Sequence, residues 1–179
     1  MTRPLDIKIL SLNECTDFVK TKSNFNIVSI RSTYRTPKEI YEIIDDKKDN
    51  YDSIIIESFD DVERREPMYV EPKLEQIERI LNWSSKIGNN FAVHCTAGAS
   101  RSSSIAYLIA CQKMDPKEAV KILDFWIHTP NQLIIKLGEQ VLGNDKLLKV
   151  MLNAAHEHYK LYKTEWDDKF AKMSAFIVC

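Results

Sequence analysis

The chain has 179 residues, of which 44% are hydrophobic, and its formal net charge is −1. This length and composition suffice for one domain, and we expect a single domain over 1–179 with its core in about 1–155. The balanced charge gives no sign of nucleic-acid binding or of a basic membrane-binding surface, and no run approaches the roughly 20 apolar residues of a membrane span.

Apolar patterns predict strands that alternate with helices along the chain. Four segments have the pattern of strands: 7–12, 26–30, 53–59 and 91–93. Six segments have helical patterns: 12–22, 37–44, 71–86, 101–110, 115–128 and about 145–173. The alternation predicts an α/β fold with a mostly parallel sheet and helices on both faces. In such sheets ligands bind at the carboxyl ends of the strands.

The last predicted helix forms a C-terminal extension of the core. Its outer part, 160–172, carries Tyr162, Trp166 and Phe170 among charged residues. These aromatic side chains could dock a partner protein, or the segment could pack back on the domain.

One segment, 91–102, carries most of the chemical information. Three apolar residues end at His94-Cys95, five small residues follow, and Arg101-Ser102 opens a helical pattern. Small residues let a loop curl so that successive backbone N–H groups point at one anion, and a helix N-terminus adds partial positive charge. The residues expected to bind phosphate are Thr96, Ala97, Gly98, Ala99, Ser100 and Arg101.

Two side chains of this segment predict its chemistry. The planar guanidinium of Arg101 can bind two phosphate oxygens at once, which lysine cannot do. Because Cys95 faces the same amides and the guanidinium, we expect it to be a thiolate near neutral pH. The segment therefore predicts an anion cradle around a sulfur nucleophile, which is what phosphoryl transfer through a cysteinyl phosphate requires.

The string His-Cys-x-Ala-Gly-x-Ser-Arg-Ser between a strand and a helix resembles the signature of the protein tyrosine phosphatase superfamily, in the form of its compact dual-specificity-like members. Segment 128–134, with Pro130-Asn131, resembles the Pro-Asn segment that follows in these proteins, and 137–143 resembles a bacterial group of predicted tyrosine phosphatases. The resemblance covers about residues 25–150. It implies the cysteine-phosphatase fold and catalysis without a metal or cofactor.

The resemblance also implies a general acid at the end of the strand 53–59, which would protonate the leaving oxygen. Phe59-Asp60-Asp61-Val62 matches a Phe-x-Asp-Ile/Val element and favours Asp61, with Asp60 as the alternative acid. The residues that follow, 62–71, are expected to form a mobile acid loop. Tyr34 and Arg35, after the second strand, could wall the pocket.

Three further residues receive supporting roles. Ser102 can hydrogen-bond the sulfur and help the thiolate leave when water cleaves the intermediate, or it can satisfy backbone at the helix start. His94 is expected behind the cysteine, where it would fix loop carbonyls. Asn131 could hold the catalytic loop through side-chain to backbone hydrogen bonds, or serve as a helix N-cap or turn residue.

The substrate class follows from uncharged loop positions. Phosphoinositide phosphatases of the superfamily usually place lysines in the loop, where this chain has Thr96 and Ala99. The expected substrate is therefore a phosphorylated protein or peptide bearing phosphotyrosine, with phosphoserine and phosphothreonine left open. The alternatives are a non-catalytic phosphopeptide-binding module, or another Cys-x5-Arg enzyme acting on a phosphorylated lipid, nucleotide or small molecule.

The cysteines and the N-terminus bear on the compartment. The four cysteines (Cys15, Cys95, Cys111 and Cys179) are widely spaced and include no CxxC pair, so we expect neither a zinc site nor a disulfide framework. The N-terminus lacks the apolar core of a signal peptide. Because a cysteine nucleophile also needs a reducing environment, a cytoplasmic protein is expected.

Overall fold

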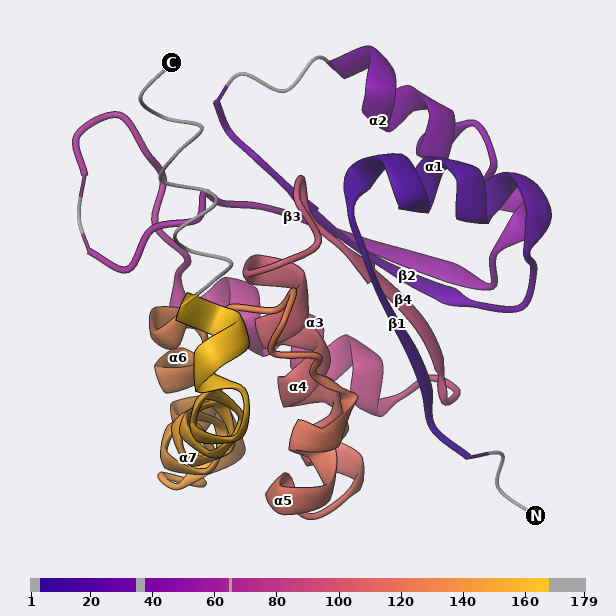
Figure 1. Cartoon of the computed structure of the whole chain (residues 1–179). Helices are drawn as coiled ribbons and strands as arrows, with labels where there is room; N and C mark the ends of the chain where they lie inside the picture. The colour runs from indigo at the N-terminus through magenta and orange to yellow at the C-terminus, as the bar shows by residue number, and fades with distance from the viewer. Residues whose placement is uncertain (1–3, 35–37, 65, 168–179) are drawn as a thin grey trace.

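A computed structural model describes residues 4–34, 38–64 and 66–167 (Figure 1). Its four strands are all parallel and form one sheet in the order β1-β4-β2-β3. The strands are β1 (Asp6–Leu10), β2 (Asn26–Arg31), β3 (Ser53–Ser58) and β4 (Asn90–His94). Each coincides with a predicted strand to within one or two residues.

Helices cover both faces of the sheet (Figure 1). One face carries α1 (Leu12–Thr21) and α2 (Lys38–Asp45). The other carries α3 (Leu74–Ser85), α4 (Arg101–Lys113), α5 (Pro116–Ala119), α6 (Gln132–Leu142) and α7 (Leu147–Leu161). Two short 3-10 helices complete the described elements: η1 (Lys48–Asn50) and η2 (Val120–Ile122). This arrangement confirms the predicted α/β fold.

Strand β4 lies inside the sheet, between β1 and β2. Val93 pairs with Ile9 on one side and Val28 on the other. Phe91 and Ala92 are fully buried as well. A strand covered on both faces needs apolar residues at successive positions, which explains the unbroken run before His94.

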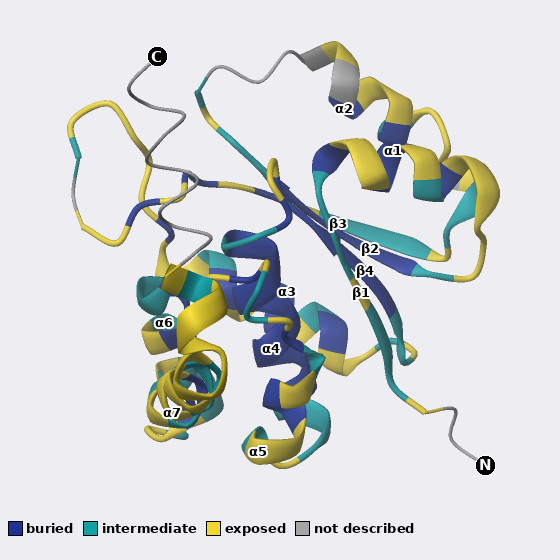
Figure 2. Ribbon diagram, in the orientation of Figure 1, coloured by how far each residue is buried: buried dark blue, intermediate teal, exposed yellow. Residues whose placement is uncertain are grey.

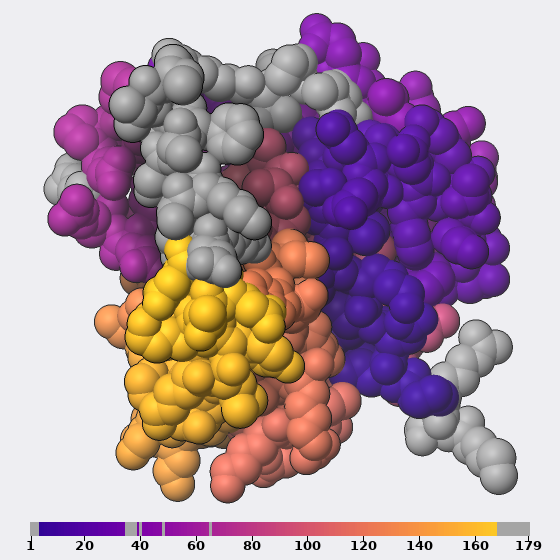
Figure 3. Space-filling model, in the orientation of Figure 1, coloured from indigo at the N-terminus to yellow at the C-terminus, as the bar shows by residue number. Residues whose placement is uncertain are grey.

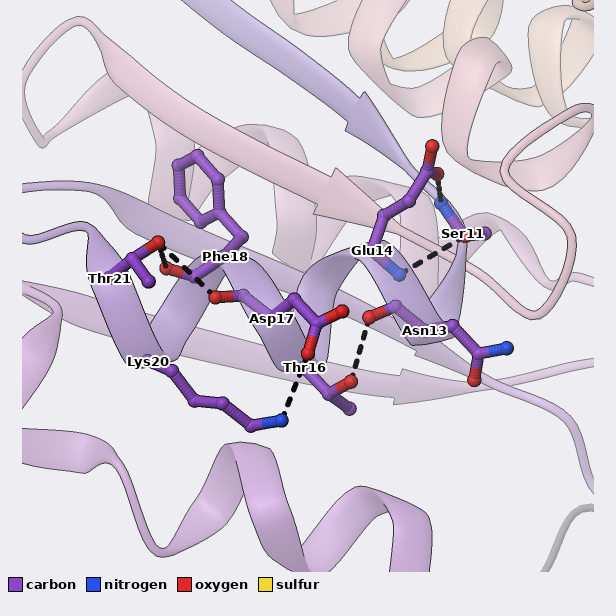
Figure 4. Close-up of polar contacts among 8 residues, drawn as sticks. All are labelled: Ser11, Asn13, Glu14, Thr16, Asp17, Phe18, Lys20 and Thr21. Atoms are coloured by element: carbon purple, nitrogen blue, oxygen red, sulfur yellow. Dashed lines mark hydrogen bonds and ion pairs between the residues drawn. The ribbon is translucent and has the colours of Figure 1, made fainter.

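Helix α1 begins at a capping box that also fixes the turn after β1. Figure 4 shows the Ser11 N–H donating to Glu14 Oε2 at 2.7 Å, while the Glu14 N–H donates to Ser11 Oγ at 3.3 Å. Such reciprocal bonds satisfy two of the donors that a helix N-terminus leaves free. Further along the helix, Lys20 pairs with Asp17 at 2.9 Å. The turn at Ser11 lies directly against the loop that follows β4.

Helix α4 forms the centre of the larger core. Its first ten residues, 101–110, are all buried, as the dark blue ribbon in Figure 2 shows. Tyr107 donates a hydrogen bond to the Leu147 carbonyl at 3.0 Å and so ties α4 to α7. Gly138 of α6 leaves room for Leu108, because a Cβ atom there would lie 2.3 Å from Leu108 Cδ2.

The predicted helix 115–128 was wrong beyond residue 122. Leu123 is extended (φ −87°, ψ 127°), and local side-chain bonds then hold a turn. Asp124 Oδ1 accepts from the Trp126 N–H at 2.9 Å, and His128 Nδ1 accepts from the Asp124 N–H at 2.9 Å. These bonds give the backbone an alternative to helix, so that Trp126 lies in a turn.

Helix α6 was missing from the predicted elements, although both of its ends carry ordinary signals. The Asn131 side chain caps its start by accepting from the Ile134 N–H at 3.1 Å. Gly143 ends it in the left-handed conformation at φ 62°. The predicted helix 71–86 begins later than expected, at Leu74, because Pro72 is followed by an extended Lys73.

The C-terminal helix is interrupted rather than continuous over 145–173. Helix α7 ends at Leu161, Tyr162 is its C-cap, and residues 163–167 are helical again. Trp166 stacks on Trp126 with ring centroids 4.9 Å apart and an interplanar angle of 17°. Tyr162 and Trp166 therefore pack back on the domain, whereas Phe170 lies outside the described residues. No helix within 4–34, 38–64 and 66–167 is long and apolar enough to cross a membrane.

Candidate active site

The nucleophile candidate lies where the sheet topology predicts a ligand site. Cys95 directly follows β4, and its loop opens at the carboxyl edge of the sheet before α4 begins. The loops after the neighbouring strands hold it in place. The Leu12 N–H donates to the Thr96 carbonyl at 3.1 Å, and Ser32 Oγ lies 2.9 Å from Thr96 Oγ1.

Gly98 gives the loop its curl. Its φ is +77°, in the left-handed region that side chains disfavour, and a Cβ atom there would lie 2.6 Å from the Ser11 nitrogen and 2.9 Å from the Leu10 carbonyl carbon. The resulting conformation lets the Gly98 N–H point to Cys95 Sγ at 3.3 Å. Glycine is therefore required both by the backbone angle and by the closeness of β1.

The Cys95 sulfur is buried and surrounded by hydrogen-bonding groups. Its side chain is 2% exposed, and Ser102 Oγ lies 3.3 Å from Sγ. Ser102 stands in the first turn of α4, so that the helix N-terminus faces the same sulfur. The Gly98 amide, the Ser102 hydroxyl and the helix N-terminus therefore all lie around this one sulfur.

Arg101 is buried, and its two Nη atoms are hydrogen-bonded whereas Nε is not. Its Nη1 donates to the Phe59 carbonyl at 2.8 Å, and its Nη2 donates to Thr96 Oγ1 at 3.2 Å. Its buried Nε–H has no acceptor among the described residues. Because buried donors are almost always paired, this unpaired N–H is available to hydrogen-bond an anionic ligand in the loop.

The two candidate acids occupy different environments. Asp60 is buried and accepts from the Thr33 N–H at 2.9 Å, from the Thr33 hydroxyl and from the Val70 N–H at 3.0 Å. Burial raises the pKa of Asp60, but the hydrogen bonds from Thr33 and Val70, together with the nearby Arg101 charge, outweigh it and leave the pKa below its usual value. These bonds, with the Asp60 N–H donating to the Val70 carbonyl at 2.7 Å, let Asp60 hold the two ends of the acid loop together.

Asp61 is exposed and faces the pocket. Its Oδ1 accepts from Ser100 Oγ at 2.7 Å and from Asn131 Nδ2 at 3.0 Å. Its Oδ2 accepts no hydrogen bond within the described part of the chain. Two donors thus orient the carboxyl group through one oxygen and leave the other to a ligand.

Asn131 connects three parts of the site. Besides Asp61, its Nδ2 donates to the Val62 carbonyl at 3.2 Å, and its backbone N–H donates to Ser104 Oγ in α4 at 2.7 Å. The sequence left open whether Asn131 holds the catalytic loop or serves as an N-cap or turn residue. The structure places it as the N-cap of α6 through Oδ1, and the loop that its Nδ2 binds is the acid loop.

His94 lies behind the nucleophile, as expected, but its partner is a side chain. The ring Nε2 is 2.8 Å from Ser29 Oγ on the neighbouring strand. Burial lowers the pKa of His94 to about 4, so the ring is neutral at physiological pH. Ser29 also accepts from Arg31 Nε at 3.2 Å, and Arg31 is paired with Asp45.

A pocket of about 430 Å³ opens above the loop. Thr96, Arg101 and the two acids contribute to it, together with residues that the sequence did not single out: Ser32, Val62, Glu66 and Tyr69. Tyr34, expected as a wall, does line it, and its ring meets that of Tyr69 edge-on at 5.9 Å between centroids. Arg35 lies outside the described residues.

Thr33 and Tyr69 were missed because no local pattern marks them. Both lie in loops, and they reach the site only when the loop after β2 meets the acid loop. Cys111, by contrast, lies down α4 away from these residues, and burial raises the pKa of its thiol to about 12.

Comparison with solved structures finds low identity. PTPMT1 in complex with PI(5)P aligns at 14% identity and a TM-score of 0.46, covering 77% of this chain and 93% of that one. The Yvh1 phosphatase domain from Chaetomium thermophilum aligns at 15% and 0.45, covering 76% and 89%. Tk-PTP in its active form aligns at 13% and 0.40, covering 86% and 93%. No curated protein matches the chain by sequence.

Comparison with protein families gives a match that includes the loop, the acid loop and Asn131. The matching family is "Dual specificity phosphatase, catalytic domain", and the match extends over residues 13–137, which is more than half of the chain. It identifies the family without distinguishing a subgroup or a substrate. The chain therefore belongs to the dual-specificity phosphatase catalytic-domain family and is a cysteine-based phosphatase.

Proposed function

We propose that this protein hydrolyses phosphotyrosine in proteins or peptides through a cysteinyl-phosphate intermediate. The observation that carries the proposal is the loop itself: the buried Cys95 sulfur lies 3.3 Å from both the Gly98 N–H and Ser102 Oγ, beside a guanidinium with a vacant N–H. A phosphate group bound there would place phosphorus next to sulfur and its oxygens next to these donors.

In the first step the Cys95 thiolate attacks phosphorus, the S–P bond forms, and the bond to the leaving oxygen breaks. Asp61 donates its proton to that oxygen through the unbound Oδ2. In the second step water attacks phosphorus, Asp61 takes the proton from water, and the S–P bond breaks. Ser102 then hydrogen-bonds the departing thiolate, and inorganic phosphate leaves. Arg101 and the loop amides stabilise the charge that develops on the equatorial oxygens in both steps.

The walls of the pocket support a phosphorylated aromatic ring as the substrate. Tyr34 and Tyr69 offer ring edges and faces on which a phosphotyrosine ring can pack. Among the described lining residues, Arg101 is the one cation, against the acids Asp60, Asp61 and Glu66. A ligand with several phosphates would meet repulsion from these acids, so a single phosphomonoester fits the charges better.

The first test is hydrolysis of p-nitrophenyl phosphate in the presence of EDTA. Cys95→Ser should abolish turnover, whereas Cys111→Ser, a cysteine on the far part of α4, should leave it unchanged. Arg101→Lys should lower kcat/KM by a factor on the order of 100 to 1,000, because the planar fork is lost. A wild-type protein that binds vanadate but does not turn over would instead be a phosphate-binding module.

The acid is tested with a matched pair. Asp61→Asn should lower kcat by a factor of about 100, since general acid catalysis contributes about this much. The Asp60→Asn variant lacks the charge of the adjacent residue but should retain most of the turnover if it is folded. The opposite result would make Asp60 the acid. A panel of phosphotyrosine, phosphoserine and phosphothreonine peptides with a phosphoinositide then decides the substrate class.

A further inference from the structure

A second, larger pocket lies beside the catalytic one. It has a volume of about 570 Å³ and is lined mainly by apolar groups, among them Phe125, Pro130, Leu152, Tyr159 and Trp166. Its floor is formed by α7 and by the turn before α6, which Figure 3 shows as adjacent yellow and orange surfaces. The charged residue Glu63 lies at its edge.

The two pockets share one wall, made of the short segments 61–63 and 130–132. Asp61 and Val62 line the catalytic pocket, and the next residue, Glu63, lines the second pocket. On the other segment, Pro130 and Gln132 line the second pocket on either side of Asn131. Hydrogen bonds join the segments, because Asn131 Nδ2 donates to Asp61 and Val62 and the Gln132 N–H donates to Glu63 Oε1 at 2.9 Å.

The shared wall puts the pockets within reach of one short peptide. Residues two positions apart in an extended chain are separated by about 7 Å, so 61 and 63 lie no further apart than this. A peptide bound with its phosphotyrosine over Cys95 would therefore pass the second pocket within a few residues. Trp166, which lines the second pocket, is held in place by stacking on Trp126. A side chain that is already fixed loses less conformational entropy when a ligand binds.

We propose that the second pocket binds an apolar side chain of the phosphopeptide substrate, two to four residues from the phosphotyrosine. This inference rests on the proposed function and adds a sequence preference to it. The occupant is a large aliphatic or aromatic side chain, because the described lining offers apolar and ring surface, and its acid Glu63 accepts from the Gln132 N–H in the shared wall. Burying such a side chain strengthens peptide binding without affecting a small aryl phosphate that cannot reach the pocket.

The experiment compares kcat/KM for phosphotyrosine peptides in which leucine, phenylalanine or serine stands at each position from −4 to +4. We expect leucine or phenylalanine at one position to raise kcat/KM about tenfold over serine. Leu152→Glu and Tyr159→Ala should remove that gain while leaving p-nitrophenyl phosphate hydrolysis unchanged. The control Leu161→Glu, on the same helix but outside the pocket and 78% exposed, should keep the gain.

Equal rates for all peptides in the wild type would overturn the inference and leave the proposed function standing. So would an equal effect of Leu152→Glu and Leu161→Glu on the preferred peptide. If p-nitrophenyl phosphate is hydrolysed and no phosphotyrosine peptide is, the proposed substrate class fails and this inference fails with it. The pattern across the two substrate types therefore separates the two failures.

Discussion

Replacing Gly98 by alanine tests whether the catalytic loop is held by its contact with β1. Gly98 and Gly143 both have positive φ, at +77° and +62°, so an added Cβ strains each backbone in the same way. They differ in what the Cβ would meet. At Gly98 it would collide with backbone atoms of Leu10 and Ser11, whereas at Gly143 nothing lies within 4 Å.

The structure sets the relative magnitudes. A left-handed residue with a Cβ costs about 1 kcal/mol or somewhat more, which is the whole effect expected for Gly143→Ala. The Cβ of Gly98→Ala would lie 2.6 Å from the Ser11 nitrogen, well inside ordinary contact at 3.4 Å. Backbone cannot swing aside as a flexible side chain can, so the overpacking adds about 1–3 kcal/mol. We expect a total loss of about 2–5 kcal/mol for Gly98→Ala.

Urea unfolding of both variants at pH 7 measures these losses, and p-nitrophenyl phosphate turnover measures the effect on the loop. Gly98→Ala should lose turnover even under conditions in which it is fully folded, because the Gly98 N–H would move away from the Cys95 sulfur. Gly143→Ala should keep full turnover. Similar losses of stability in the two variants, or a fully active Gly98→Ala protein, would refute the reasoning.

Three further predictions concern buried residues. Burial lowers the pKa of His94 to about 4, against about 6.5 in the unfolded chain. Between these pH values the imidazole is protonated in the unfolded state and neutral in the folded state. The free energy of unfolding should therefore fall by up to about 3 kcal/mol as the pH drops from 6.5 to 4. Urea midpoints across this range should show a weaker slope for His94→Gln. Asp60→Asn should cost about 2 kcal/mol at pH 7, since an amide NH₂ would face the donors of Thr33 or Val70. This difference should shrink as acid protonates the wild-type carboxylate below pH 4, because the folded-state pKa is the lower one. Gly138→Ala should lower the melting temperature, because pushing Leu108 aside costs more than the roughly 1 kcal/mol gained in helix propensity.

The sequence predicted those parts of the molecule that depend on neighbouring residues. The four strands follow from short apolar runs, and the catalytic loop follows from the spacing between Cys95 and Arg101. The prediction of a helix over 115–128 failed beyond residue 122 because the side chains of Asp124 and His128 accept hydrogen bonds from nearby backbone N–H groups. Helix propensity does not account for side chains that compete with the helix for backbone hydrogen bonds. Helix α6, which the sequence analysis did not predict, has an N-cap residue at Asn131 and a C-cap glycine at Gly143, and both signals are visible in the sequence.

The environments of the two acids could not be read from neighbouring residues. Asp60 and Asp61 are adjacent and chemically alike. They differ because Asp60 accepts from Thr33, 27 residues earlier in the chain, whereas Asp61 accepts from Asn131, 70 residues later. The partner of His94 is Ser29 on another strand, 65 positions away. Contacts of this kind arise when the sheet assembles, so they have no signature in any window of the sequence.

The strand order has a consequence for how the protein is made. Ile9 pairs with Val93, and Gly98 packs on Ser11, so the first strand has no partner in the sheet until the ribosome has added residues more than 80 positions later. Strands β2 and β3 can pair while synthesis continues, but the strand that belongs between β1 and β2 is the last of the four to emerge. Closing so long a segment is slow. The nascent chain therefore acquires its catalytic cradle in the same late step that completes the sheet, and a product truncated before residue 94 can build neither.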